Sequence, residues 1–255
     1  MEKKSYAHGT PSWIDLGSPD IEASAGFYGG LFGWTVEEES GPEAGGYRMC
    51  TLGGKAVAGL GPQQNPGPPL WTTYVTVDDV DATAETVTAA GGQVVMPPME
   101  VLTAGKMAIF ADAGGAAFST WQPGDHIGAE LVNEPSTLSW NELITTDVEG
   151  AKAFYGQVFG WGGVTHEGEM PYTEFKLGDA SIAGMMPKPP TMPADVPPHW
   201  GVYFAVSDVG EAAAKATELG GAVIMPPFDT PQGPMAVLAD PHGATFNVIA
   251  LPAEG

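Results

Sequence analysis

The chain has 255 residues, and its 31 acidic and 9 basic side chains give a formal net charge of −22. Nucleic acids are bound through clustered Lys and Arg that neutralise phosphates, so this balance excludes DNA and RNA as partners and disfavours an anionic membrane surface. The acidity is typical of a solvated, self-repelling protein surface.

Cys50 is the only cysteine, which excludes an internal disulfide and a cysteine metal cluster. The first residues have no apolar run after their lysines, and no stretch of 18 apolar residues occurs, so neither a signal peptide nor a membrane span is expected. We therefore expect a cytoplasmic protein.

A strand and an amphipathic helix are the first predicted elements. The strand covers Trp13 to Gly17, Ser18 is the expected helix N-cap with Pro19 as the first helical residue, and Gly33 is the expected stop. Apolar residues at spacings of four, three and four predict one buried helix face: Ile21, Ala25, Tyr28 and Phe32.

Strands and a second helix are expected next. Two short strands, around Tyr47–Leu52 and Ala56–Leu60, flank a double-glycine turn, and a longer strand covers Trp71–Val77. Asp78 or Asp79 caps the second helix, which Gly91 ends. Three more strands complete the half: Val94–Met96, Met107–Ala111 and Ala117–Trp121.

The second half of the chain repeats the first. Five ordered blocks recur at an offset of 127 to 129 residues: Trp13–Leu16 as Trp140–Leu143, Phe27–Trp34 as Phe154–Trp161, Trp71–Val80 as Trp200–Val209, Gly91–Pro98 as Gly220–Pro227, and Met107–Asp112 as Met235–Asp240. The pattern predicts an α+β fold of four βαβββ modules in two domains, residues 8–123 and 136–252, joined by a loop.

These modules resemble the vicinal oxygen chelate superfamily, which includes glyoxalase I, bleomycin-resistance proteins and extradiol dioxygenases. The matching landmarks are an aspartate before the first helix (Asp20, Asp147), Phe-Tyr then Phe-Gly-Trp at its end, Val-x-Asp-Val before the second helix, and Asp240-Pro241-His242-Gly243. The resemblance covers about residues 10–250, and the tandem arrangement is similar to an actinobacterial group. It implies two cup-shaped, half-barrel glyoxalase-like domains, each with a site inside its cup.

The resemblance also implies where metal ligands would stand. Counting from the family's aspartates gives three strand positions in each half, which in relatives carry His, Gln or Glu. Here they carry side chains unsuited to a divalent ion: Trp13, Thr72 and Ser119, then Trp140, Gly201 and Asn247. We therefore expect no metal and no other cofactor.

Strand alternation predicts what lines the cups instead, because residues two apart share a face. The expected ligand-binding side chains are Trp13, Thr72, Tyr74, Ser119 and Trp121 in the first cup, and Trp140, Tyr203, Thr245 and Asn247 in the second. Asp15 and Glu142 share the same faces and are the candidate catalytic residues, because burial beside aromatic rings raises a carboxyl pKa. Met96–Met99 and Met225–Phe228 are expected as flexible apolar lips.

Four functions remain open. The first is binding of a small apolar or aromatic molecule, such as an antibiotic, a natural-product intermediate or a related metabolite. The second is a metal-independent enzyme that uses carboxylate acid–base chemistry on such a molecule, and the third is a metal-dependent lyase or dioxygenase with unusual ligands. The fourth is a structural protein whose tryptophans fill both cups. The expected partner is a small molecule, and the chain is expected as a monomer or homodimer.

Overall fold

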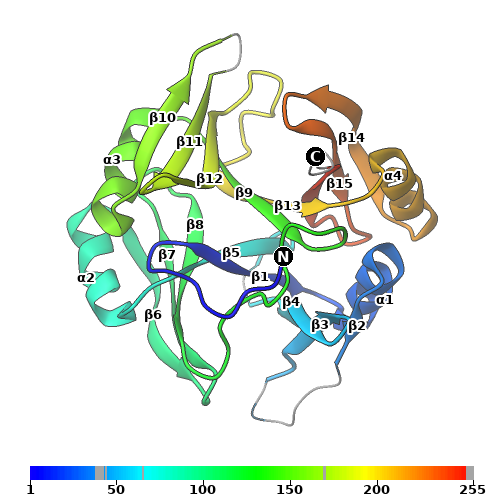
Figure 1. The fold of residues 1–255 in the computed structure, drawn as a ribbon, viewed down its shortest axis with the longest axis horizontal. Helices are drawn as coiled ribbons and strands as arrows, with labels where there is room; N and C mark the ends of the chain where they lie inside the picture. The colour runs from blue at the N-terminus through cyan, green and yellow to red at the C-terminus, as the bar shows by residue number, and fades with distance from the viewer. Residues whose placement is uncertain (38–42, 44, 65, 169–170, 251–255) are drawn as a thin grey trace.

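Each half of the chain folds into one curved sheet of eight strands that carries two helices. The computed structural model describes residues 1–255 except 38–42, 44, 65, 169–170 and 251–255. Figure 1 shows the first half from β1 to β8 and the second from β9 to β16, with the four helices at the periphery.

Two βαβββ modules make up each half. The first half contains β1 (Pro11–Ser18), α1 (Ile21–Phe32), β2 (Thr35–Val36), β3 (Arg48–Leu52), β4 (Lys55–Pro62), β5 (Leu70–Thr76), α2 (Val80–Ala89), β6 (Gln93–Val101), β7 (Gly105–Ala111) and β8 (Ala117–Pro123). The second half contains β9 (Leu138–Thr145), α3 (Val148–Phe159), β10 (Gly162–His166), β11 (Tyr172–Leu177), β12 (Ala180–Pro187), β13 (His199–Ala205), α4 (Val209–Glu218), β14 (Ala222–Thr230), β15 (Gly233–Ala239) and β16 (Thr245–Ile249).

The strand orders of the two sheets are equivalent. They are β2-β3-β4-β1-β5-β8-β7-β6 and β10-β11-β12-β9-β13-β16-β15-β14. In each sheet the first strands of the two modules pair antiparallel at the centre, as β1 with β5 and β9 with β13. The predicted fold of four βαβββ modules in two tandem domains is confirmed.

Aspartate caps begin all four helices. Asp20, rather than the expected Ser18, is the N-cap of α1, and its carboxylate accepts the backbone N–H of Ala23. Ser18 bonds the Ser24 hydroxyl instead, so the prediction of its capping role, with Pro19 as the first helical residue, was wrong. Gly33 ends α1 in the left-handed conformation, as predicted. No helix in the described ranges is long and apolar enough to cross a bilayer.

The segments expected as flexible lips belong to edge strands. Met96–Met99 lies in β6 and Met225–Phe228 in β14, and both contain a register shift at their proline pair. Proline has no N–H to donate, which explains a bulge at this point of an edge strand. These segments therefore form the outer walls of the cups.

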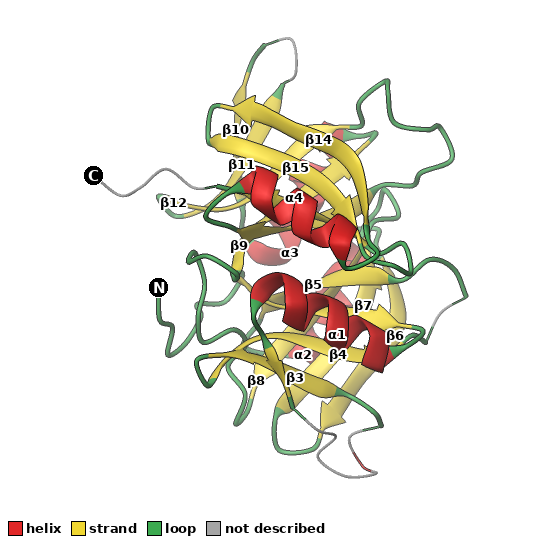
Figure 2. Cartoon of the chain, turned by 90° about the vertical axis from the view of Figure 1, so that its right-hand side faces the viewer, coloured by secondary structure: helices red, strands yellow, loops and turns green. Residues whose placement is uncertain are grey.

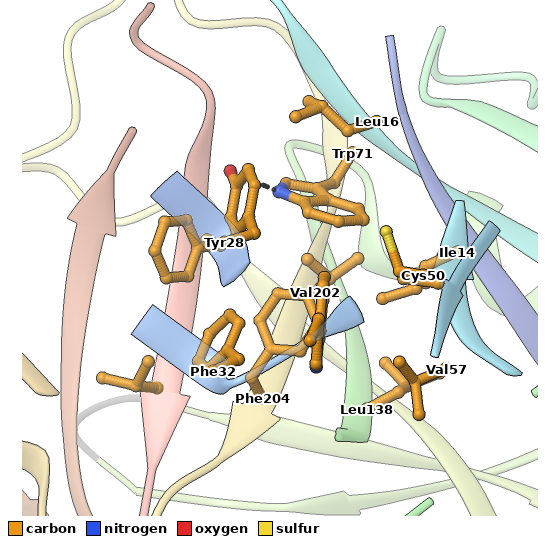
Figure 3. Close-up of a cluster of buried hydrophobic side chains, with 14 of the residues drawn as sticks. Ile14, Leu16, Tyr28, Phe32, Cys50, Val57, Trp71, Leu138, Val202 and Phe204 are labelled. Carbon is orange, nitrogen blue, oxygen red and sulfur yellow. Dashed lines mark hydrogen bonds between the residues drawn. The ribbon is translucent and has the colours of Figure 1, made fainter. Parts of the chain in front are cut away.

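The helices of one half pack against the other half. Figure 2 shows α1 beside α4 between the two sheets. Phe32 of α1 packs on Phe204 of β13 with ring centroids 4.8 Å apart, and Figure 3 shows both rings beside Tyr28 and Trp71 in one core cluster. The second cluster likewise joins α3 to β8, through Phe118 and Phe159. Neither half therefore completes its core alone.

Two equivalent hydrogen-bond chains cross between the halves. Tyr28 of α1 donates to Asp240 at 3.2 Å and accepts the Trp71 indole N–H at 3.1 Å. Tyr155 of α3 donates to Asp112 at 2.9 Å and accepts the Trp200 indole N–H at 2.8 Å. All these side chains are buried, so each bond satisfies groups that would otherwise be costly to remove from water.

Each aspartate of these chains also shapes its own turn. Asp112 Oδ1 accepts the amides of Gly114 and Ala116, and Asp240 Oδ1 accepts those of His242 and Ala244. Each carboxylate therefore has two roles. It fixes the turn before the last strand of its own half, and it binds a helix tyrosine of the other half.

We predict that Tyr28→Phe lowers the free energy of unfolding by about 1–3 kcal/mol, because Asp240 and Trp71 each lose a buried partner. Urea denaturation of Tyr28→Phe, Asp240→Asn and the double variant should give a coupling energy above about 0.5 kcal/mol. The same cycle with Asp112→Asn is the control, because Tyr28 does not touch that residue and the effects should add. Additive effects in both cycles would contradict a stabilising hydrogen bond between Tyr28 and Asp240.

Candidate functional site

A buried carboxylate stands between two tyrosines in the first cup. Asp15 Oδ2 accepts the hydroxyl of Tyr74 at 2.7 Å and that of Tyr47 at 3.4 Å. The Trp13 indole N–H donates to the same Tyr47 hydroxyl at 2.9 Å. Thr72 lies opposite Asp15 on β5 and also bonds its carboxylate.

The second cup repeats this arrangement. Glu142 accepts the hydroxyl of Tyr203 at 2.7 Å and is also within hydrogen-bonding reach of Tyr172. The Trp140 indole N–H donates to Tyr172 at 2.8 Å. The order tryptophan, tyrosine, carboxylate, tyrosine is therefore common to both cups.

Tyr47 and Tyr172 were missed by the sequence analysis, and two glycines explain how they reach the carboxylates. Gly59 pairs with Asp15 across β4 and β1, and Gly184 pairs with Glu142 across β12 and β9. A Cβ at either glycine would collide with the tyrosine hydroxyl. One sequence signal for this contact was available. Both repeats have a tyrosine followed by a glycine inside a later strand, at equivalent places.

Burial sets the electrostatics of both carboxylates. It raises the pKa of Asp15 to about 6, although the hydroxyls of Tyr74, Tyr47 and Thr72 act in the opposite direction. Burial likewise raises the pKa of Glu142, opposed by Tyr203 and Tyr172. A carboxyl group with a raised pKa can take up or release a proton closer to neutral pH than a free one.

The linker between the domains covers the aromatic half of the first cup. The His126 ring packs edge-on against Trp13 with centroids 4.5 Å apart and against Trp121 at 5.6 Å. The Trp121 indole N–H donates to the His126 carbonyl at 2.8 Å. The linker then bonds two strands of this sheet, whose places Figure 1 shows. The amide of Ala129 donates to the carbonyl of Ser12 in β1, and the amide of Glu130 donates to the carbonyl of Ala56 in β4.

This cover leaves Trp13, Tyr74 and Trp121 at most 6% exposed. Asp15, Thr72 and Tyr47 keep partial access to solvent. Ser119, at 0% exposure, lies beside Tyr74 on the neighbouring strand. The predicted residues of this cup are thus together, but its tryptophans face the protein's own linker.

The second cup keeps an accessible apolar wall. Ile249 stands where the repeat places Trp121, and it forms a cluster with Tyr203 and Met235 against which Trp140 packs. Phe228 and Met225 on β14 pair with Met235 and Val237 of β15, which puts them on the same face of the sheet. Their side chains are 38% and 44% exposed.

Polar groups stand beside this wall. Asn247 is opposite Tyr203, partly exposed, and its Nδ2 donates to the carbonyl of Val202 at 3.2 Å. Thr245, two residues earlier, is exposed at the start of β16 and does not contact the carboxylate cluster. Glu142 is 6% exposed and closes the inner end of the cup.

Comparison with known proteins places the chain in a family. The model of the Glyoxalase/Bleomycin resistance protein/Dioxygenase superfamily matches residues 10–120 and 137–248. The chain belongs to this superfamily. Both matched segments fall on one eight-stranded sheet each, which agrees with the tandem arrangement.

Full-length relatives of this superfamily member include CFP32 of Mycobacterium tuberculosis, which is 47% identical and covered over 98% of both chains. The anthracycline biosynthesis protein DnrV of Streptomyces peucetius is 43% identical over 96% of this chain and 94% of its own. The Mn(II)-bound glyoxalase of Novosphingobium aromaticivorans has the same fold, with a TM-score of 0.67 and 17% identity over 96% of this chain and 83% of that one.

The strand positions of the superfamily's metal ligands do not suit a metal here. Trp13 donates its N–H to Tyr47, Trp140 donates to Tyr172, and Gly201 has no side chain. The remaining positions offer hydroxyls and one amide, which are weak ligands for a divalent ion compared with imidazole or carboxylate. No group of three His, Cys, Asp or Glu side chains suited to an ion occurs within the described part of the chain.

We predict that protonation of His126 weakens the linker's contact with the first cup. Burial lowers the pKa of His126 from 6.5 to about 4, although Glu130 acts in the opposite direction. The unfolded chain therefore binds this proton more readily, and His126 destabilises the fold as the pH falls through 6.5 towards 4. Relative to His126→Phe, which keeps a ring but cannot titrate, the wild type should lose on the order of 1 kcal/mol across this range. Urea denaturation at several pH values checks this, and a constant difference would contradict it.

We also predict that Gly184→Ala displaces Tyr172 from its place beside Glu142. The added methyl group cannot share space with the hydroxyl, and such overpacking costs about 1–3 kcal/mol of stability. Gly26→Ala is the matched control, because a Cβ at that helical glycine meets nothing within 4 Å. Thermal unfolding of both variants compares them, and equal melting temperatures would show that Tyr172 is not held by this gap.

Proposed function

We propose that the protein binds a small apolar or aromatic molecule in its second cup without a metal ion. The observation that carries this proposal is the wall of Phe228, Met225 and Trp140, in which Trp140 stays partly exposed whereas the equivalent Trp13 is 3% exposed beneath His126. Large apolar side chains with a few polar groups at one end are typical of ligand pockets.

The residues divide into two roles in this proposal. Trp140, Tyr203 and Met225 contact the ring system, while Glu142 and Asn247 orient its polar substituents. Thr245 contacts the ligand at the rim. In the first cup, Thr72 and Asp15 retain access to solvent, but the ring-binding surface of Trp13 and Trp121 is taken by His126.

The kind of ligand follows from the relatives. DnrV carries the name of an anthracycline biosynthesis protein, and it is similar to this chain along nearly its whole length. This supports an aromatic natural product or its biosynthetic intermediate as the ligand. The poor fit of both ligand sets to a divalent ion supports a metal-independent site.

A metal-independent enzyme is the second candidate function. The pKa of Asp15, raised to about 6, and the raised pKa of Glu142 favour it, because both groups exchange protons closer to neutral pH than free carboxyl groups do. In this case Glu142 takes a proton from a ring substituent of the bound molecule, and Tyr172 and Tyr203 stabilise the carboxylate before the transfer. Turnover that survives Glu142→Gln and Asp15→Asn would eliminate this candidate.

The remaining proposals concern the context of the protein. We propose domain limits of 8–123 and 136–252, a cytoplasmic location, no nucleic-acid partner, and a monomer or homodimer. The net charge of −22 supports the absence of nucleic acid, and the buried, unpaired Cys50 supports a reducing compartment.

We predict that a flat aromatic probe such as 1-naphthol saturates the protein at one site per chain. Phe228→Ala should weaken binding about tenfold, because it removes a large apolar contact. Val223→Ala is the control, since Val223 pairs with the core residue Leu238 on the helix-facing side of the same strands. Equilibrium dialysis measures both, before and after treatment with EDTA. Equal loss in both variants, or loss after EDTA, would contradict the proposed site.

A further inference from the structure

The buried hydrogen-bond donors around Glu142 are already used within the protein. Tyr203 donates to Glu142 at 2.7 Å, and the Trp140 N–H donates to Tyr172 at 2.8 Å. The Tyr172 hydroxyl is directed to Glu142, and the Asn247 Nδ2 donates to the carbonyl of Val202. The two tyrosine hydroxyls, the Trp140 indole and one N–H of Asn247 are therefore turned towards protein acceptors.

Acceptor atoms remain at the same place. A carboxylate offers about four lone-pair positions on two oxygens, so two tyrosine hydroxyls do not exhaust Glu142. The Oδ1 of Asn247 is the second acceptor, because the Nδ2 of that amide holds the Val202 carbonyl. The polar end of the cup is thus rich in acceptors.

Gly201 brings no side chain to the strand position beside these two acceptors. It pairs with Glu142 on β9, and a Cβ built on it would lie 3.3 Å from the Asn247 Nδ2. The equivalent position in the first cup is Thr72, whose hydroxyl bonds Asp15. The second cup therefore lacks the hydroxyl that bonds the carboxylate from this position in the first cup.

We propose that the second cup selects aromatic molecules that carry a hydrogen-bond donor, a hydroxyl or an ammonium group, over the same ring with an acceptor alone. This inference rests on the proposed function. A donor satisfies Glu142 and Asn247, whereas an ether or carbonyl oxygen would face two acceptors and lose its water without replacement. The net charge of −22 also attracts a cationic ligand.

Three probes with one ring system test the proposal by equilibrium dialysis: 1-naphthol, 1-naphthylmethylamine and 1-methoxynaphthalene. We expect the hydroxyl or the ammonium probe to bind at least tenfold more tightly than the ether. Tighter binding of 1-naphthol identifies a hydroxyl as the preferred donor, and tighter binding of 1-naphthylmethylamine identifies an ammonium group. Equal affinity for all three would overturn the donor rule while leaving the aromatic site intact, and no binding of any probe would overturn both.

Two substitutions locate the selectivity. Glu142→Gln replaces the carboxylate by a group that is both donor and acceptor, and Asn247→Leu removes the amide. Each should reduce the preference over the ether to less than about threefold. Glu85→Gln removes an exposed charge on α2 and is the control for net charge. Selectivity that survives both site variants would overturn the proposal, and far-ultraviolet circular dichroism verifies that each variant is folded.

Discussion

The hydrogen bond from a helix tyrosine of one half to a turn aspartate of the other is the constraint on which the structure depends. Tyr28 with Asp240, and Tyr155 with Asp112, join the halves at two equivalent places. Each aspartate also holds the turn before the last strand of its half, so the packing of the two halves and the start of that strand are coupled.

The two cups share their carboxylate clusters and differ in what lies above them. In the first, Trp121 and His126 fill the aromatic half, whereas Ile249 packs with Tyr203 and Met235 in the second. One strand position also differs, because Thr72 bonds Asp15 whereas Gly201 has no side chain to bond Glu142. A few side chains therefore give the two cups different surroundings on one common backbone.

The repeat and the strand periodicity were sufficient to predict the fold, because five blocks at one offset fix four modules. Parity also identified Asp15 and Glu142 as cup-facing groups beside Tyr74 and Tyr203. The sequence analysis missed Tyr47 and Tyr172, because their contacts depend on sheet register against Gly59 and Gly184 and only the repeated tyrosine and glycine hint at them. Nor could it predict the position of His126, because a loop's path is set by long-range contacts rather than by local pattern.

The linker has a consequence for symmetry. Two identical, separate domains joined only by the hydrogen bonds of Tyr28 and Tyr155 would have two equal cups. Joining them in one chain requires a segment to run from the end of β8 to the start of β9, and this segment places His126 against Trp13 and Trp121 of the first cup. The connection itself therefore makes the surroundings of the two copies inequivalent.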